Sequence, residues 1–98
     1  MMLVTEIYNT LKQAQLVSTL EEYSTQWLNK HKTTASYLIH KKRDLSIRNK
    51  VNCLNSIIER LQDLKKSEFI CQFESKKIKN LEYAKQILIL NLFKNKIF

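Results

Sequence analysis

Residues 22–39 decide the predicted fold, and they read Glu22-Tyr23-Ser24-Thr25-Gln26-Trp27-Leu28-Asn29-Lys30-His31-Lys32-Thr33-Thr34-Ala35-Ser36-Tyr37-Leu38-Ile39. Asn29 tolerates the left-handed conformation better than other non-glycine residues, so a helix is expected to end there. The preceding Ser18-Thr19-Leu20-Glu21 is a capping box, so Ser18 is expected to open that helix. Apolar residues between these two points recur at helical spacing and predict one buried face, formed by Leu20, Tyr23, Trp27 and Leu28.

A second short helix is expected over residues 33–42, after a turn of about four residues. Thr33 or Thr34 can cap its first turn. Its apolar stripe is narrow, so most of its surface is expected to be polar; the stripe consists of Ala35, Leu38 and Ile39. Two short helices joined by a tight turn form a helix-turn-helix arrangement.

The same stretch places small and apolar residues at characteristic positions. Thr25 lies four positions before the turn residue Asn29, a polar cap follows, and Ala35 and Leu38 lie three apart on the inner face of the next helix. This pattern resembles the helix-turn-helix of lambda-repressor-like and Cro-like DNA-binding domains, over roughly residues 3–64. The Tyr-Ser-x-x-Trp-Leu stretch at 23–28, followed by Ser-Tyr-Leu at 36–38, is similar to small uncharacterised bacterial proteins thought to carry this fold.

The resemblance implies a DNA-binding function and a recognition helix, and it has three departures. Asn29 replaces the usual glycine of the turn, and His31 stands where a serine or threonine cap is common. The glutamate and glycine that often close the recognition helix are missing, and Lys41 and Lys42 lie nearby instead. A serine after a basic stretch often starts the family's next helix, and Ser46 occupies such a position.

The composition favours helices throughout. The chain has 98 residues, enough for one small domain, and contains neither glycine nor proline. Glycine-rich phosphate loops and dinucleotide-binding fingerprints are excluded, because their backbones need conformations that only glycine tolerates. Hairpins that turn on Asn-Gly or Asp-Gly are excluded for the same reason. We therefore predict an all-α bundle of four to five helices.

Three further helices follow from apolar periodicity. Residues 3–15 form an amphipathic first helix, and Ser46 caps another helix whose expected core stripe is Ile47, Val51, Leu54, Ile58 and Leu61. Residues 68–73 fit either one short strand, because apolar residues alternate there, or a continuation of the preceding helix. A final helix spans 76–95, with one apolar face formed by Ile78, Leu81, Ala84, Leu88 and Leu92.

The final helix is apolar beyond a single face, so both of its sides must be buried. We expect a second copy of the chain to cover it, through Ile87, Leu88, Leu92 and Phe93. Packing back onto the chain's own core is the alternative. Residues 1–64 are thus predicted to form a DNA-binding domain, and residues 65–98 a C-terminal extension that dimerises, within one compact unit.

Positive charge is concentrated in one block. The chain has a formal net charge of +8, and residues 29–50 alone sum to +6, whereas residues 1–28 sum to −2. A compact basic block beside near-neutral flanks is typical of a surface that meets polyanions. A solvated lysine-rich face is the alternative explanation.

The predicted recognition helix combines this charge with hydrogen-bonding groups, as a helix that enters the major groove requires. We expect base edges to be contacted by Lys32, Thr33, Thr34, Ser36 and Tyr37. We expect phosphates to be bound by Lys30, His40, Lys41, Lys42, Arg43 and Arg48. The predicted function is that of a homodimeric transcriptional regulator of bacterial or mobile-element origin. The alternative is a small helical module, of the phage or plasmid accessory type, that binds an acidic partner protein.

Other functions gain little support. No metal site is expected, because Cys53 and Cys71 lack close paired spacing and His31 and His40 have no cysteine near them. No cofactor, small-molecule ligand or catalytic constellation is evident, so we do not expect an enzyme. The chain begins without a charged leader and apolar run, and its longest strongly apolar run is Ile87–Leu90. We therefore expect no membrane segment and a cytoplasmic location.

Overall fold

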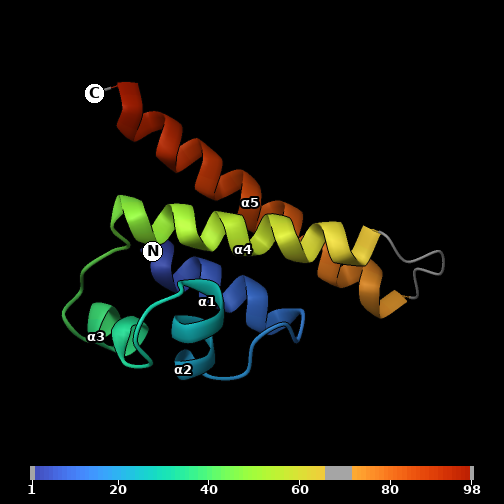
Figure 1. Cartoon of the computed structure of the whole chain (residues 1–98), viewed down its shortest axis with the longest axis horizontal. Coiled ribbons are helices and arrows are strands. Elements are labelled where there is room, and N and C mark those ends of the chain that lie inside the picture. Colours follow the sequence, from blue (N-terminus) through green and yellow to red (C-terminus); the bar gives the residue numbers. More distant parts are fainter. Residues whose placement is uncertain (1, 66–71, 98) are drawn as a thin grey trace.

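The computed structural model describes residues 2–65 and 72–97 (Figure 1). Along the chain, long helices precede and follow two short ones. Within these residues all regular structure is helical, which confirms the all-α prediction. The elements in chain order are α1 (Leu3–Gln13), α2 (Leu20–Glu22), the π-helical turn η1 (Tyr23–Trp27), α3 (Thr34–His40), α4 (Ile47–Lys65) and α5 (Gln72–Ile97). The strand considered at 68–73 lies mostly outside the described residues, and 72–73 already belong to α5.

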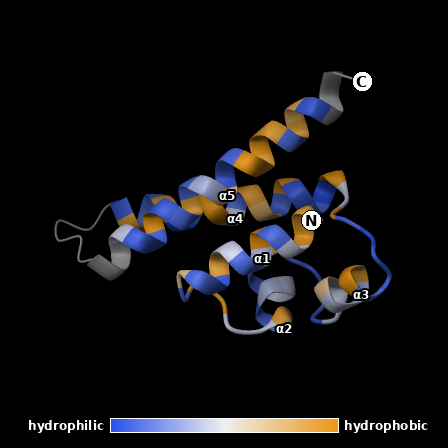
Figure 2. Cartoon of the chain, turned by 180° about the vertical axis from the view of Figure 1, so that it is seen from behind, coloured by the Kyte–Doolittle hydropathy of each residue, from blue (hydrophilic) through white to orange (hydrophobic). Residues whose placement is uncertain are grey.

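The long helices form one side of the molecule and the short helices the other. α5 packs along α4 and also contacts α1, while η1 packs against α4 (Figure 1). α3 lies below the start of α4 and contacts α1, α2 and η1. The hydropathy colouring in Figure 2 shows mixed apolar and polar residues along α1, α4 and α5, as expected for helices that bury one face.

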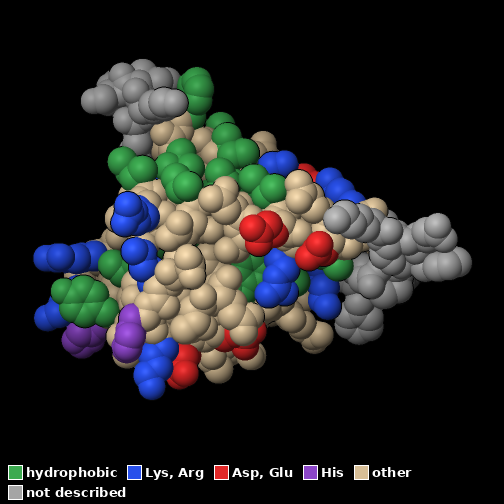
Figure 3. Space-filling model, in the orientation of Figure 1, with side chains coloured by type: hydrophobic (Ala, Val, Ile, Leu, Met, Phe, Trp, Pro, Cys, Tyr) green, Lys and Arg blue, Asp and Glu red, His purple; other side chains and the backbone are tan. Residues whose placement is uncertain are grey.

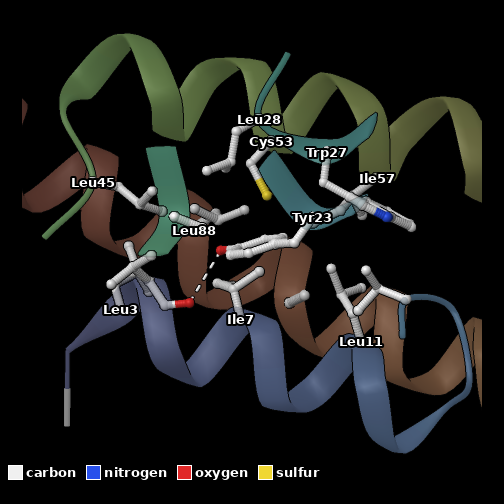
Figure 4. Close-up of a cluster of buried hydrophobic side chains, with 14 of the residues drawn as sticks. Leu3, Ile7, Leu11, Tyr23, Trp27, Leu28, Leu45, Cys53, Ile57 and Leu88 are labelled. Carbon is white, nitrogen blue, oxygen red and sulfur yellow. Dashed lines mark hydrogen bonds between the residues drawn. The ribbon is translucent and has the colours of Figure 1, made fainter. Parts of the chain in front are cut away.

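The aromatic side chains of η1 fill the centre of the core (Figure 4). Tyr23 and Trp27 are completely buried, and the Tyr23 hydroxyl donates to the Val4 carbonyl oxygen at 3.1 Å. Burial is the main cause that raises the pKa of Tyr23 well above its usual value. Burial also raises the pKa of the neighbouring Cys53 thiol to about 12, so this thiol stays protonated and unreactive at neutral pH.

The helix formed by α2 and η1 begins one residue later than the sequence predicts. Thr19 is the N-cap, and its hydroxyl oxygen accepts from the Glu22 N–H at 3.1 Å. Ser18 Oγ donates instead to the Glu22 carboxylate at 2.9 Å. The capping interaction therefore uses Thr19 and Glu22 rather than Ser18 and Glu21.

The hydrogen bonds of η1 span one residue more than those of an α-helix, and this changes which small residue is buried. The Leu28 N–H donates to the Tyr23 carbonyl at 3.1 Å, five residues back. Ser24 is consequently the completely buried small residue, whereas Thr25 is exposed. The prediction that Thr25 occupies the small-residue position is wrong. It places that position four residues before Asn29, as in an α-helix, whereas the wider π-helical turn places it five residues before, at Ser24.

Ser24 joins the two short helices directly. Its hydroxyl accepts from the Ala35 N–H at 2.8 Å and donates to the Leu20 carbonyl at 2.9 Å. Ala35 is itself completely buried, so the first turn of α3 packs closely against η1. A larger side chain at either position would separate the helices.

Of the core stripe predicted for α4, Leu61 is buried and Leu54 and Ile58 are half-buried, but the first two positions are not in the core. Ile47 and Val51 are exposed, by 62% and 41%, and the buried positions are Asn49, Lys50, Cys53, Ile57 and Leu61. The reason is polar: Asn52 Nδ2 donates to the Leu28 carbonyl and Ser56 Oγ to the Trp27 carbonyl, each at 3.1 Å. These bonds turn the Asn52 side of α4 towards η1, and the predicted stripe moves to the flank.

α5 contributes to the same core as α1, through Leu81, Ala84 and Leu88. The centre of its predicted apolar face is therefore confirmed, while Ile78 and Leu92 are half-buried. Leu88 is completely buried within the single chain. Its assignment to a dimer interface is wrong, because it has no surface to offer a second copy.

Replacement of Ser24 tests the register of η1. Ser24→Ala leaves the buried Ala35 N–H without an acceptor, so the free energy of unfolding should fall by about 1–3 kcal/mol in urea titrations. Thr25→Ala is the matched control, because Thr25 makes a similar bond to the Glu21 carbonyl on the exposed side. It should change stability by no more than about 0.5 kcal/mol. A larger loss for Thr25→Ala would contradict the π-helical register.

Candidate nucleic-acid interface

α3 presents a polar outer face because only a few of its residues are needed for packing. Ala35 is completely buried and Leu38 and Ile39 are half-buried, which confirms the narrow inner stripe. Ser36 and Tyr37 point away from the core, and Tyr37 is 51% exposed. Tyr37 is the large apolar side chain that α3 leaves in solvent.

The residues before α3 form a short turn ordered by His31. The Thr33 N–H donates to His31 Nδ1 at 3.3 Å, and Thr33 Oγ1 lies 2.9 Å from the same nitrogen. The Thr34 N–H donates to the His31 carbonyl at 3.0 Å. Of the residues predicted to contact bases, Thr34 is half-buried, and four are exposed on the same short segment: Lys32, Thr33, Ser36 and Tyr37.

A left-handed residue, Lys42, ends α3. Its φ is 55°, its N–H donates to the Ile39 carbonyl at 3.1 Å, and the Arg43 N–H donates to the Leu38 carbonyl at 2.8 Å. These two bonds form a Schellman motif, in which glycine is the usual left-handed residue. Lys42 therefore closes the helix in the place of the missing glycine, and the predicted range 33–42 is shortened to Thr34–His40.

Asp44 fixes the basic loop to the body of the molecule. Its carboxylate accepts from the Leu3 N–H at 2.9 Å and from the Val4 N–H at 2.8 Å. It therefore caps α1 from a distant part of the sequence, since the N-cap residue Met2 offers no side-chain bond. The next residue, Leu45, is buried in the core. Together these contacts hold the cations that precede Asp44 beside α3.

The cations gather around α3 and the loop that follows it. Figure 3 shows basic side chains (lysine or arginine) and histidine side chains on this part of the surface, at the lower left. Lys30 is half-buried, and the other predicted phosphate-binding residues are exposed: His40, Lys41, Lys42, Arg43 and Arg48. Within the described residues the ion pair found joins Lys65 to Glu82, on α4 and α5. The cations around α3 are therefore available to a polyanion.

Lys50 belongs to the basic block of the sequence, but its side chain does not contribute to the surface around α3. It is only 8% exposed, because the rotation of α4 turns it inward. The structural roles of Ser24 and Asp44 were also not predicted. The sequence contains one indication that Asp44 has a structural role, because it is the single acid within residues 29–50.

Comparison with known proteins places the chain in a family. The model of DUF6626, a family of unknown function, matches residues 4–91. The chain belongs to DUF6626. No curated protein and no solved structure gives a significant match. The DUF6626 match runs from the second residue of α1 to Asn91 in α5, and therefore includes the whole surface around α3.

No group of three or more histidine, cysteine, aspartate or glutamate side chains in the described part of the chain could hold a metal ion. Cys71 lies outside the described residues. None of the described helices combines the length and the apolar character that crossing a membrane requires.

Removal of the Asp44 carboxylate should destabilise this DUF6626 chain. Asp44→Ala leaves two amides at the start of α1 without their acceptor, and the free energy of unfolding should fall by about 1–2 kcal/mol. Thermal unfolding would then show a melting temperature lower by roughly 4–16 °C for a domain of this size. Asp63→Ala, at an exposed position on α4, is the charge-matched control and should leave stability nearly unchanged. Equal melting temperatures for the two variants would contradict the capping role.

Proposed function

We propose that this chain is a sequence-specific DNA-binding protein, a transcriptional regulator that inserts α3 into the major groove and acts as a homodimer. The observation that carries the proposal is the polar outer face of α3, flanked by exposed cations that have no acidic partner among the described residues. The resemblance of residues 22–39 to Cro-like domains supports the same function. Such a regulator would act in the cytoplasm.

Base recognition would fall to the start of α3 and the turn before it. The major groove is about 12 Å wide and admits one helix, whose N-terminal residues then face base edges. Lys32 can donate to guanine O6 and N7, and the hydroxyls of Thr33 and Ser36 can donate or accept. The exposed ring of Tyr37 can lie against a thymine methyl group.

Phosphate contacts would fix the orientation of α3 without specifying sequence. Lys41, Lys42 and Arg43 follow α3 directly, and Arg48 lies on the first turn of α4. His40 and the half-buried Lys30 flank the same helix. In a homodimer two such surfaces would contact half-sites about one helical turn of DNA apart, so the preferred site would be a near-palindrome.

A module that binds an acidic protein is the second candidate, because an exposed tyrosine among cations also suits an acidic peptide. Trp27 weighs against it. Tryptophan is a preferred anchor at protein interfaces, and here it is completely buried in the core. The two candidates differ in whether a DNA sequence is selected.

Selection from a random duplex pool at two salt concentrations tests the proposal. A near-palindromic sequence should be enriched, and the affinity should fall steeply with salt, by a slope of about 0.9 for each phosphate contact. Charge reversal of Lys32, Lys41 and Arg43 to glutamate should weaken binding to the selected duplex by about 100-fold or more.

The matched control reverses three lysines at the end of α1 and near the start of α5: Lys12, Lys76 and Lys77. It changes the net charge by the same amount and should weaken binding by no more than about fivefold, since screening limits the effect of charges that do not touch the DNA. Equal losses for the two triple variants would show that only bulk charge matters. No enriched sequence, or unchanged binding by the first variant, would refute sequence recognition by α3.

A further inference from the structure

The second half of α5 carries the largest group of exposed apolar side chains among the described residues. Ile89, Leu90 and Phe93 are exposed by 42%, 60% and 63%. Ile47 and Val51, on the first turns of α4, are exposed as well. Figure 3 shows hydrophobic side chains gathered along the upper edge of the molecule, between the start of α4 and the end of α5. We call these five residues the α4–α5 face.

The α4–α5 face arises from the way the two helices cross. The end of α4 lies beside the first half of α5, where Lys65 and Glu82 form an ion pair at 2.7 Å. Towards the start of α4 and the end of α5 the two helices diverge (Figure 1), and Ile47 and Val51 on the first turns of α4 are exposed. Side chains that the sequence pattern places in a core are therefore left in solvent.

Grooves on both sides of α5 continue this surface. One, of about 550 Å³, lies between α5 and the start of α1, where Leu3 and Leu90 line it beside Glu6, Asp44 and Lys94. The other, of about 560 Å³, lies on the outer side of α5. Apolar residues line it together with Lys79, Glu82 and Lys85. The two grooves thus contribute three acids and three lysines around an uncharged centre.

We infer that a second copy of this chain covers the α4–α5 face, with the second halves of the two α5 helices packed against each other around a two-fold axis. This inference deepens the proposed function, on which it rests for the role of the dimer. Charge favours this occupant. A two-fold contact places the same surface of both chains together. The α4–α5 face has an uncharged centre and a rim with equal numbers of acids and lysines, so it avoids the repulsion that two chains with a net charge of +8 would otherwise experience.

The area is consistent with the same occupant. The five exposed side chains supply on the order of 500 Å² of apolar surface, at the upper end of what monomeric proteins expose as one patch. The flanking grooves extend the contact towards the roughly 800 Å² per partner that stable interfaces bury. An acidic partner protein would instead favour a predominantly basic rim, whereas the rim of this face carries as many acids as lysines.

The dimer would leave α3 free. α3 contacts α1, α2 and η1, on the side of the molecule away from the free edge of α5 (Figure 1). Of the interface predicted from sequence, Phe93 stays exposed, and Ile87 and Leu92 are half-buried at its edges. Leu88 is not part of the inferred interface, because it is buried. The inferred interface contains four residues that the sequence prediction did not include: Ile47, Val51, Ile89 and Leu90.

Sedimentation equilibrium of the full chain tests the inference. The wild-type chain should have twice the 11.7 kDa monomer mass, and this mass should persist at high salt, because apolar contacts are not screened. The double variant Leu90→Glu/Phe93→Glu should raise the dimer dissociation constant by about 30-fold or more. The variant Ile47→Glu should weaken the dimer independently, through the other helix of the α4–α5 face.

Tyr37→Glu is the control, since Tyr37 is similarly exposed but lies on α3. It should remain dimeric while losing DNA binding. Circular dichroism should show folded helices for every variant, because each substituted side chain is exposed. A wild-type chain that stays monomeric, free or bound to vesicles or another protein, would overturn the inference, as would variants of full dimer mass. Dimerisation without DNA binding would refute only the proposed function.

Discussion

The hydrogen bond from the Ala35 amide to the Ser24 hydroxyl determines how α3 lies on the rest of the molecule. It exists because η1 holds an additional residue in its turn, which rotates Ser24 rather than Thr25 into the helix crossing. The same rotation buries Tyr23 and Trp27 against α1 and α4. With its first turn fixed in this way, α3 buries only Ala35 completely and leaves its polar side chains outside.

A chain without glycine must end its helices by other means. Within residues 2–65 and 72–97, three residues take left-handed conformations, with φ between 54° and 60°: Gln15, Asn29 and Lys42. Each carries a side chain in a region that costs non-glycine residues roughly 1–2 kcal/mol. The left-handed Lys42 also places a cation at the end of α3. The Asp44 carboxylate holds the loop that follows α3 against α1, by accepting from two amides at the start of that helix. Residues 41–44 therefore have two roles. They end α3 and attach the loop that follows it, and they supply positive charge to the candidate DNA interface.

Local patterns were sufficient to predict the all-α fold, the five helices, the turn at Asn29 and the narrow stripe of α3. Long-range polar contacts were not predictable in this way. Asn52 and Ser56 rotate α4 by bonding carbonyls at the end of η1, and this exposes Ile47 and Val51, which the apolar spacing had placed inside. The π-helical turn likewise has no signature in composition. Leu88 was misassigned because a helix that is apolar on several sides does not indicate which side its own core will bury.

The most direct test of the account is an NMR titration of the labelled full chain with the selected duplex. If α3 enters the major groove, the largest amide shifts fall on residues 30–37, with further shifts at 41–43 and at Arg48. The amides of Ile89, Leu90 and Phe93 should not change, because the second half of α5 lies away from α3 (Figure 1). Shifts centred on α5, or spread evenly over the exposed lysines of α1 and α5, would contradict recognition by α3.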